Sequence, residues 1–560
     1  MMRTAFAVLG ALTMTGCVLV QETEGEGGGG SGGTGGTGDQ PCDGVPTTGI
    51  CLDEHTIRGC FVSEDFDTPP QVIETTCQDS EACVMGVNGA ECQLIGDCYD
   101  GDSQCQDAST LLNCVNAAWV PEDCGSVSCV SQPGLGAQCL SAAGGTGIML
   151  NGHLEYEYLL PNGSLTDFDS TPHAEGAVDF FVTVYHIPQN GDPSEMIGMG
   201  LTSPGGNGSN PGDWSIELSQ AVNENCFLYF WPMLFDNNGQ PRMALAKAQS
   251  ADAIHQASTE YWSWGFETCA EGTGECGTTD LGTQLITTDM DSGAAHIYQW
   301  LDYGIFRFEG LYPGIDPLSY AVFWAPGNDF NCGNCFVPPI GGGANVTYDT
   351  QQNLIDHYDT AMNISGSQDS PTMWAKSVIN HEFGHWSMAS YTKSPGEGGV
   401  HYVNAASRPG LSYSEGYATF VGQSQISTSN SDNDPIYFTK KSGTTFWVDI
   451  SKNTYSGGPL DPPDPNGPID QYINENVVAS MFWSFWASAQ AVTPQGLGET
   501  PVFDTFRSPR LMGTTDRGYH TVDMIDYLDA MTCESTATGA QISAVASGVG
   551  YPWDSSPICP

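Results

Sequence analysis

The sequence predicts a multidomain protein in which disulfide-rich repeats and a β-sandwich precede a larger α+β domain. Residues 42–140 contain twelve cysteines and few large aliphatic side chains. Residues 148–256 contain alternating or continuous apolar segments that are separated by Gly, Asn and Pro, which is typical of a sandwich. Residues 290–560 then combine helix-length apolar patterns with short strand-like segments. At 560 residues the chain has room for about three or four domains.

The composition restricts both the partners and the compartment. Fourteen Lys and Arg against 66 Asp and Glu give a formal net charge of −52, which excludes nucleic acid and anionic membrane surfaces as partners. We interpret the acidic residues as a solvated surface, as in secreted proteins. Twenty cysteines indicate an oxidising compartment, because disulfides persist there.

Residues 1–17 are predicted to be a signal peptide. Arg3 precedes an apolar segment, 5–14, which is too short to span a membrane. The segment ends in Met-Thr-Gly-Cys17, which resembles a bacterial lipobox with Cys17 as the acylated residue; cleavage by an ordinary signal peptidase is the alternative. Lipid at Cys17 would anchor the chain to a bilayer. The expected location is therefore the cell envelope, as an outer-membrane lipoprotein or at the extracellular surface.

Residues 18–41 and 42–140 have contrasting compositions. The first segment is mostly Gly, Thr, Ser and acidic residues, and it is predicted to be a flexible tether. The second divides into two units of six cysteines, which close with Gly-Ala-Glu-Cys92 and Gly-Ala-Gln-Cys139. Disulfides stabilise such units because their cores are small. Their connectivity stays open; zinc-ribbon binding would need Cys-x-x-Cys pairs, which this segment lacks.

Within the sandwich, the predicted strands are residues 154–159, 178–185 and 226–231. In the last domain, residues 294–309, 474–490 and 521–531 are predicted to be helices because their apolar residues recur at helical spacing.

The clearest indication of chemistry is the pattern His381-Glu382-Phe383-Gly384-His385. Ser370 and Pro371 fit the N-cap and first position of a helix that would contain it. On this helix His381 and His385 would project from the same side, so that both imidazoles could bind one zinc ion. Glu382 could then accept a proton from a water at the metal. The alternative is a pair of ordinary core or surface histidines.

A catalytic zinc site needs a third protein ligand and an open position. Met388 and Tyr391 follow His385 where the metzincin pattern has Gly and His, so that family is excluded. Residues 412–420, Ser-Tyr-Ser-Glu-Gly-Tyr-Ala-Thr-Phe, are similar to the gluzincin metallopeptidases, in which a downstream helix supplies a glutamate in a Glu-Gly-x-Ala-x-aromatic context.

The resemblance implies a zincin-like fold for residues 290–560. It further implies that His381, His385 and Glu415 bind zinc and that Glu382 is the general base. For Glu415 a structural alternative remains, because Ser412-x-x-Glu415 is also a capping box.

Two departures from the family limit the substrate. Thermolysin-like enzymes have Asp where this chain has Thr419, and the aminopeptidase motif Gly-x-Met-Glu-Asn has no counterpart. The resemblance therefore favours an endopeptidase that acts on polypeptides over an exopeptidase.

Three further features of the site are left open by the sequence. Gluzincins usually add a His or Tyr that stabilises the oxyanion, and Tyr472, His401 and His520 are the candidates. Zincins also place an antiparallel edge strand over the zinc helix, for which residues 344–348 are the candidate. Acidic residues in 432–434 and 461–470 could hold Ca²⁺, although neither segment has a calcium-ligand spacing.

The sequence thus predicts a zinc metalloendopeptidase that hydrolyses extracellular proteins. The alternative is a cell-surface binding or adhesion lipoprotein with a non-catalytic zinc site. Glu382 favours the enzyme, because a structural zinc site needs no base. The oligomeric state, the cleavage specificity and any propeptide are not indicated.

Overall fold

The computed structural model describes strand segments between residues 50 and 140, and most of the chain from 149 to 559. The segments are residues 50–52, 56–61, 71–76, 81–86, 89–94, 103–107, 110–115, 118–123, 128–132 and 136–140. The gaps after 149 are residues 187–194, 207, 220–225, 236–240, 248–259, 268–279, 331–332, 338–345, 350–354, 399–400, 431–433, 488–490, 514–516 and 520. The predicted lipidation site Cys17, the tether 18–41 and the oxyanion candidate His520 lie outside the described residues.

The described part of the cysteine-rich region repeats one arrangement. A three-stranded antiparallel sheet is followed by a two-stranded hairpin, and the same order then recurs. The disulfide Cys51–Cys83 joins the first sheet to the first hairpin. The strands are β1 (Ile50–Cys51), β2 (Thr56–Phe61), β3 (Gln71–Thr76), β4 (Glu81–Gly86), β5 (Gly89–Leu94), β6 (Ser103–Asp107), β7 (Thr110–Val115), β8 (Ala118–Asp123), β9 (Ser128–Gln132) and β10 (Gly136–Leu140).

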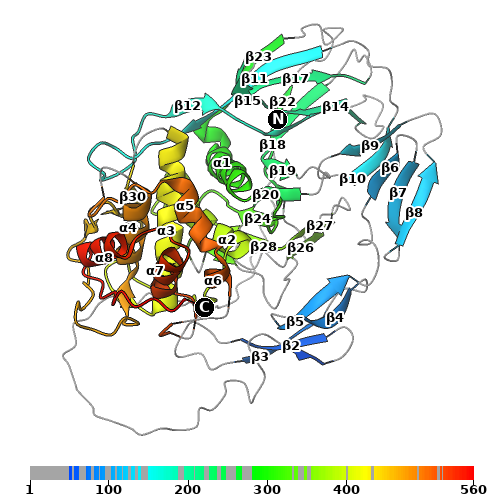
Figure 1. Ribbon diagram of the computed structural model, residues 1–560. Coiled ribbons are helices and arrows are strands. Elements are labelled where there is room, and N and C mark those ends of the chain that lie inside the picture. The colour runs from blue at the N-terminus through cyan, green and yellow to red at the C-terminus, as the bar shows by residue number, and fades with distance from the viewer. Residues whose placement is uncertain are drawn as a thin grey trace, which may run out of the picture.

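Two four-stranded sheets follow (Figure 1). One has the order β12-β11-β17 with β23 parallel to β11, and the other has the order β14-β13-β18-β22. They pack on each other, since Trp214 of one sheet meets Phe230 of the other edge-on with ring centroids 6.0 Å apart. The strands are β11 (Met149–Tyr158), β12 (His173–Gly176), β13 (Phe181–His186), β14 (Glu195–Leu201), β17 (Asp213–Glu217), β18 (Cys226–Trp231), β22 (Trp264–Glu267) and β23 (Asp280–Ile286), with a small hairpin of β15 (Pro204–Gly206) and β16 (Ser209–Pro211).

A third, mixed sheet contributes to the C-terminal part of the molecule. Its order is β19-β20-β24-β28-β25, with β21 paired to β20. Strands β20, β24 and β28 are parallel, and β25 is antiparallel to β28 at the edge. The strands are β19 (Met233–Phe235), β20 (Pro241–Lys247), β21 (Glu260–Tyr261), β24 (Tyr320–Phe323), β25 (Cys335–Val337) and β28 (Thr360–Asn363).

The helices gather on the C-terminal side of the molecule, below the sandwich in Figure 1. The helices are α1 (Gly293–Leu311), α2 (Lys376–Tyr391), α3 (Pro409–Asn430), α4 (Glu475–Trp486), α5 (Glu499–Phe506), α6 (Pro509–Met512), α7 (Met524–Cys533) and α8 (Gly539–Gly548). Small sheets among them contain β26 (Val346–Asp349), β27 (Ile355–Tyr358), β29 (Ala406–Ser407), β30 (Ile436–Lys441), β31 (Thr444–Asp449), β32 (Thr454–Tyr455) and β33 (Ile473–Asn474). None of the helices described is long and apolar enough to cross a membrane.

The structure is multidomain with mixed helices and sheets, as the sequence predicts, but strand membership crosses the expected limit at residue 256. Strands β22 and β23 lie beyond this limit and belong to the sandwich, whereas β19 and β20 precede it and belong to the mixed sheet. The composition of a segment could not show to which sheet its strand belongs, because tertiary packing decides which strands pair.

Two local predictions about the region around His381 and His385 are corrected. Ser370 and Pro371 precede a 3-10 turn, η4 (Thr372–Trp374), and α2 begins only at Lys376 after Ala375, which has non-helical angles. Of the predicted edge strand at 344–348, residues 346–348 lie in β26, which pairs with β27 in a separate hairpin, and residues 344–345 lie outside the described residues. Among the described residues, β25 is the edge strand of the mixed sheet on the side of β28.

The sandwich and α1 share one continuous core. Tyr298 of α1 lies edge-on to Phe180, with ring centroids 4.7 Å apart. Its hydroxyl donates to the carbonyl of Asp179 at 2.7 Å, and Gln299 Oε1 accepts the backbone N–H of Val178 at 2.7 Å. These buried contacts fix the sandwich on α1.

The sandwich also reaches the β30–β31 hairpin. Lys440 of β30 forms an ion pair with Asp167, with 2.9 Å between Nζ and Oδ1. Phe438 of the same strand meets Phe168 edge-on, with 5.4 Å between ring centroids. The loop after β11 thus supports a hairpin that lies next to α2.

Asp179 allows a test of the buried contact between the sandwich and α1. Burial raises its pKa from 3.8 to about 6, so the folded protein holds this proton to higher pH than the unfolded chain. Stability is therefore expected to fall as the pH rises from 4 to 6 and to stay lowered above 6. Asp179→Asn removes the charge and suits the left-handed backbone at this position, where φ is 57°. After a discount for solvent, we expect a gain of about 1–2 kcal/mol in the free energy of unfolding at pH 8 and little gain at pH 4.

Thermal unfolding at the two pH values would measure this difference, with the exposed Asp329→Asn as the control. Equal stabilisation of Asp179→Asn at both pH values would show that the buried charge is not the cause.

Candidate metal centre

The histidines of the motif lie side by side on α2. His381 Nε2 and His385 Nε2 are 3.2 Å apart, as expected for residues one helical turn apart. Both side chains belong to a largely buried helix, whose Phe383 and Trp386 are part of the core. The core-facing side of α2 is thus fixed by packing, and its histidines face α3.

Close packing of α3 brings Glu415 to these histidines. A Cβ atom at Gly384 would lie 2.6 Å from the Cα atom of Ala418, so that only glycine permits this approach of α2 and α3. As a result Glu415 Oε2 lies 3.1 Å from His381 Nε2 and 3.3 Å from His385 Nε2.

The capping-box alternative for Glu415 is wrong. Helix α3 begins at Pro409, so Ser412 lies inside it and not at the N-cap. The Ser412 hydroxyl is buried and donates to the carbonyl of Ile473 at 2.7 Å. Glu415 therefore has no capping role with Ser412, and its carboxylate faces the histidines.

The three side chains have the geometry of a metal site. His381, His385 and Glu415 form one of two groups, among the described residues, that could hold a metal ion. Atoms separated by 3.1–3.3 Å, each about 2.0–2.1 Å from one ion, would subtend angles of about 100°, which is close to tetrahedral. Burial acts to raise the pKa of Glu415, but the facing histidines hold it well below its usual range, so the carboxylate is ionised as a ligand requires.

Two hydroxyl groups of α3 orient the imidazoles. Thr419 Oγ1 lies 3.0 Å from His381 Nδ1, and Ser414 Oγ lies 3.4 Å from His385 Nδ1. Each contact uses the nitrogen that points away from Glu415, so Nε2 remains directed at the centre. Thr419 follows Glu415 by one helical turn and shares its face; this spacing was the signal by which the sequence could have identified it.

Glu382 is buried beside the centre, 5% exposed. Burial raises its pKa to about 7, although His385 and a backbone hydrogen bond from Phe336 act in the opposite direction. Phe336 belongs to β25, so the edge strand of the mixed sheet reaches the carboxylate that the sequence identifies as the base.

A second group adjoins the first and consists of His401, Glu415 and Glu475. His401 Nε2 lies 3.3 Å from Glu415 Oε2 and 3.6 Å from Glu475 Oε2. Burial raises the pKa of Glu475 above its ordinary value. The sequence analysis missed Glu475, since an acidic residue in the first turn of a helix is also favoured by the helix dipole.

The structure distinguishes between the candidates for oxyanion stabilisation by their positions. His401 lies at the centre, whereas the side chain of Tyr472 is 58% exposed. Sequence reasoning missed Tyr437 of β30, whose ring lies edge-on to His381 with 5.9 Å between centroids. Burial and the charge of Glu382 raise the Tyr437 pKa above its usual range, so its hydroxyl is a hydrogen-bond donor at neutral pH.

The segments proposed for calcium show ordinary turn contacts. Asp464 Oδ1 accepts the backbone N–H of Asn466 at 2.9 Å, and Asp434 forms an ion pair with Lys376 at 3.5 Å. Residues 432–433 lie outside the described part of the chain.

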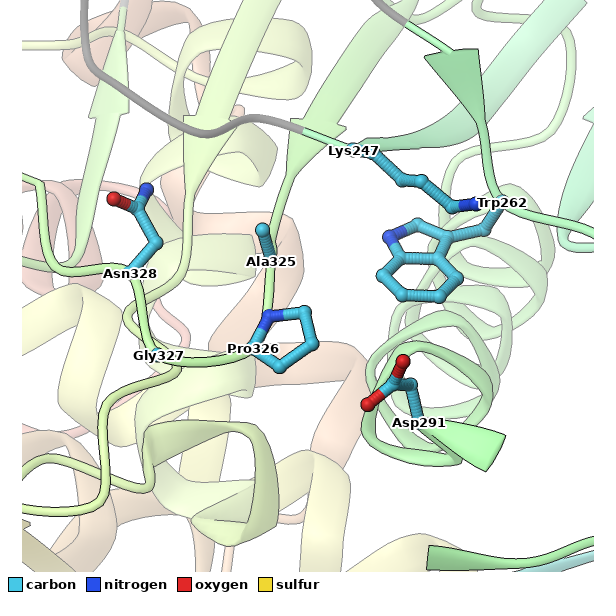
Figure 2. A pocket seen from close by; sticks show the side chains of 7 residues that line it. All are labelled: Lys247, Trp262, Asp291, Ala325, Pro326, Gly327 and Asn328. Carbon is cyan, nitrogen blue, oxygen red and sulfur yellow. The ribbon is translucent and has the colours of Figure 1, made fainter. Parts of the chain in front are cut away.

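A cavity of about 420 Å³ lies beside the start of α1, and none of its lining residues belongs to either group. Figure 2 shows Lys247 alongside Trp262 on one wall; Lys247 Nζ is 4.8 Å from the ring centroid. The lining residues are Lys247, Trp262, Asp291, Ala325, Pro326, Gly327 and Asn328.

Comparisons with known proteins do not place this chain in a family. No protein-family model matches it, and no curated protein matches it. Among solved structures, it is similar in part to a 9R-lipoxygenase from Cyanothece PCC8801, with 15% identity over 24% of this chain and 16% of that chain. The TM-score is 0.13, and the likeness carries no argument about fold or function.

Thr419 provides a test of the orienting hydrogen bonds. Thr419→Val keeps the shape of the side chain but removes the oxygen that contacts His381. We expect the affinity for zinc, used as the probe, to fall about 10- to 100-fold, while the fold is retained. Thr419→Ser, which keeps the hydroxyl, should bind zinc nearly as tightly as the wild type. Competition with a chromophoric chelator would measure the affinities; an unchanged affinity in Thr419→Val would contradict the orienting role.

Proposed function

We propose that the protein is a zinc metallopeptidase of the gluzincin type, with a zincin-like fold in residues 290–560. The observation that supports this best is the convergence of His381, His385 and Glu415 beside the buried carboxylate of Glu382. Two histidines and one carboxylate are the ligands of catalytic zinc in metallopeptidases, and such a set leaves a position open for water and substrate.

A bound zinc ion would polarise the peptide carbonyl and make a water molecule acidic. Glu382 would accept the proton of the attacking water and pass it to the leaving amine. Glu382 is buried, which would limit access of competing solvent, and its position between His381 and His385 on α2 would place it beside a bound ion. Tyr437 and His401 are the side chains available to stabilise the oxyanion.

The substrate is proposed to be an extended polypeptide bound along β25. This strand is the last in the order of the mixed sheet, and an edge strand can add a further strand through its backbone groups. Its residue Phe336 contacts Glu382, so a peptide paired there would pass the general base. We propose endopeptidase action on extracellular proteins, with the enzyme held at the cell envelope by lipid at Cys17.

The variant Glu382→Gln tests whether the protein is an enzyme or a binding protein. The amide keeps the size of the side chain but cannot accept a proton, so cleavage of an unfolded protein should slow by about two to four orders of magnitude. Zinc content should stay unchanged, and circular dichroism should show that the fold is kept. Fragment analysis by mass spectrometry would follow internal cleavage, with the exposed Glu309→Gln as the control.

Cleavage by Glu382→Gln at the wild-type rate would exclude the mechanism. If zinc-loaded wild-type protein cuts nothing in a broad peptide library, the surface-binding alternative is favoured.

Glu415→Ala tests the ligand role. Two imidazoles alone bind zinc weakly, so this variant should lose the ion on dialysis against a buffer that leaves the wild type loaded. Metal analysis by mass spectrometry would measure the zinc content, and circular dichroism would show whether the fold is kept. Full zinc occupancy in folded Glu415→Ala would exclude Glu415 as a ligand.

A further inference from the structure

We propose that His401, Glu475 and the shared carboxylate of Glu415 form a second divalent-metal site next to the first. The inference rests on the proposed function in one respect, namely that Glu415 binds the first ion. The ion bound at the new site would be a divalent transition metal, since one imidazole and two carboxylates suit zinc or manganese.

The distances fit an ion between these side chains. His401 Nε2 lies 3.3 Å from Glu415 Oε2 and 3.6 Å from Glu475 Oε2, and the three ligand atoms lie within 4.8 Å of one another. At the separations of 3.3 and 3.6 Å from His401 Nε2, two atoms that are each about 2.1 Å from one ion subtend angles of about 100–120°. The contact between His401 and Glu475 is too long for a hydrogen bond, whereas it is suited to two ligands of one ion.

An unsatisfied buried oxygen is the second, independent observation. Glu475 is 5% exposed, and its Oε2 atom accepts no hydrogen bond from the described residues. A buried carboxylate oxygen without a partner is costly, and this atom is the one that faces His401. A metal ion would supply the missing interaction.

The surrounding backbone holds His401 against Glu475. The side chains of Asn474 and Asn476, which flank Glu475, both donate to the carbonyl of Val403, at 2.8 and 2.5 Å. Strand β29, which follows His401 in the chain, pairs with β33, which ends at Asn474. The two ligands are thus tied together by their sequence neighbours and do not meet by chance. The His401 side chain is 31% exposed, so an ion can reach the site from solvent.

The shared oxygen sets the separation of the two ions. Glu415 Oε2 is the atom that approaches His381, His385 and His401. Two ions each about 2.1 Å from this oxygen lie no more than about 4 Å apart, and two-metal catalytic sites have separations of about 3.5–4 Å. The geometry therefore permits a bridged pair.

The charge of the centre also favours a second ion. Glu382, Glu415 and Glu475 are all buried, and the described ion pairs of Glu415 and Glu475 involve histidines only. With all three carboxylates ionised, one divalent ion would leave an excess of negative charge in this buried place, which is unfavourable away from water. A second ion removes this excess.

The test is the zinc content of the full chain at saturation. Metal-free protein is dialysed against excess ZnCl₂ in the presence of Mg²⁺, which occupies weak acidic sites on the surface, and bound zinc is measured by mass spectrometry. The wild type should hold two ions per chain, whereas Glu475→Gln and His401→Ala should each hold one. Glu309→Gln and His173→Ala, which alter exposed residues elsewhere, should hold two.

Each other outcome has a definite meaning. One ion per chain in the wild type would overturn the second site while leaving the first intact, and no bound zinc would overturn both proposals. If folded His401→Ala holds no zinc, His401 is a ligand of a single ion and the second site is excluded. Should Glu475→Gln fail to fold by circular dichroism, His401→Ala decides, because its partly exposed side chain is not part of the core.

Discussion

The contact between α2 and α3 at Gly384 and Ala418 is the constraint on which the candidate metal centre depends. The two helices carry the groups that converge there, and neither helix could supply them alone. Any side chain at position 384 would meet backbone atoms of α3 and would move Glu415 away from the histidines. Helix α3 also packs on α4, where a Cβ atom at Gly416 would lie 2.5 Å from Val478 Cβ. Gly384 of α2 and Gly416 of α3 thus allow three helices to pack closely around Glu415.

Sequence reasoning could predict only those residues of the candidate site that local periodicity or the family resemblance indicates. His381 and His385 follow from helical spacing, and Glu415 follows from its context. Glu475, Tyr437 and Phe336 could not be found this way, because they reach the centre from a helix start, a hairpin and a sheet edge that are distant in sequence. Tertiary packing decides which residues lie next to them, and it produces no periodic pattern in the sequence. The start of α2 was misplaced for a related reason, since Pro371 suits a 3-10 turn as well as an α-helix.

The fold shows the same division between local and long-range information. Strands β11, β13 and β18 and helices α1, α4 and α7 lie where apolar patterns predicted them. The pairing of β11 with β23, which are separated by most of the sandwich, was not predictable from either strand. Two strands of a hairpin are joined by a short turn whose residues can be recognised in the sequence. Parallel strands are joined by a long connection, so no such turn indicates their pairing.

Strand β20 has a consequence for how this protein could evolve. It precedes the region that contains His381, Glu382 and His385, yet it is an interior strand of the mixed sheet, and its Met243 and Leu245 are fully buried. The sandwich and the helical region therefore cannot be exchanged between proteins as independent modules, because a junction placed anywhere between β20 and α1 would remove a strand from the sheet beside the metal centre. The region from β11 to α8 would therefore be inherited as one unit.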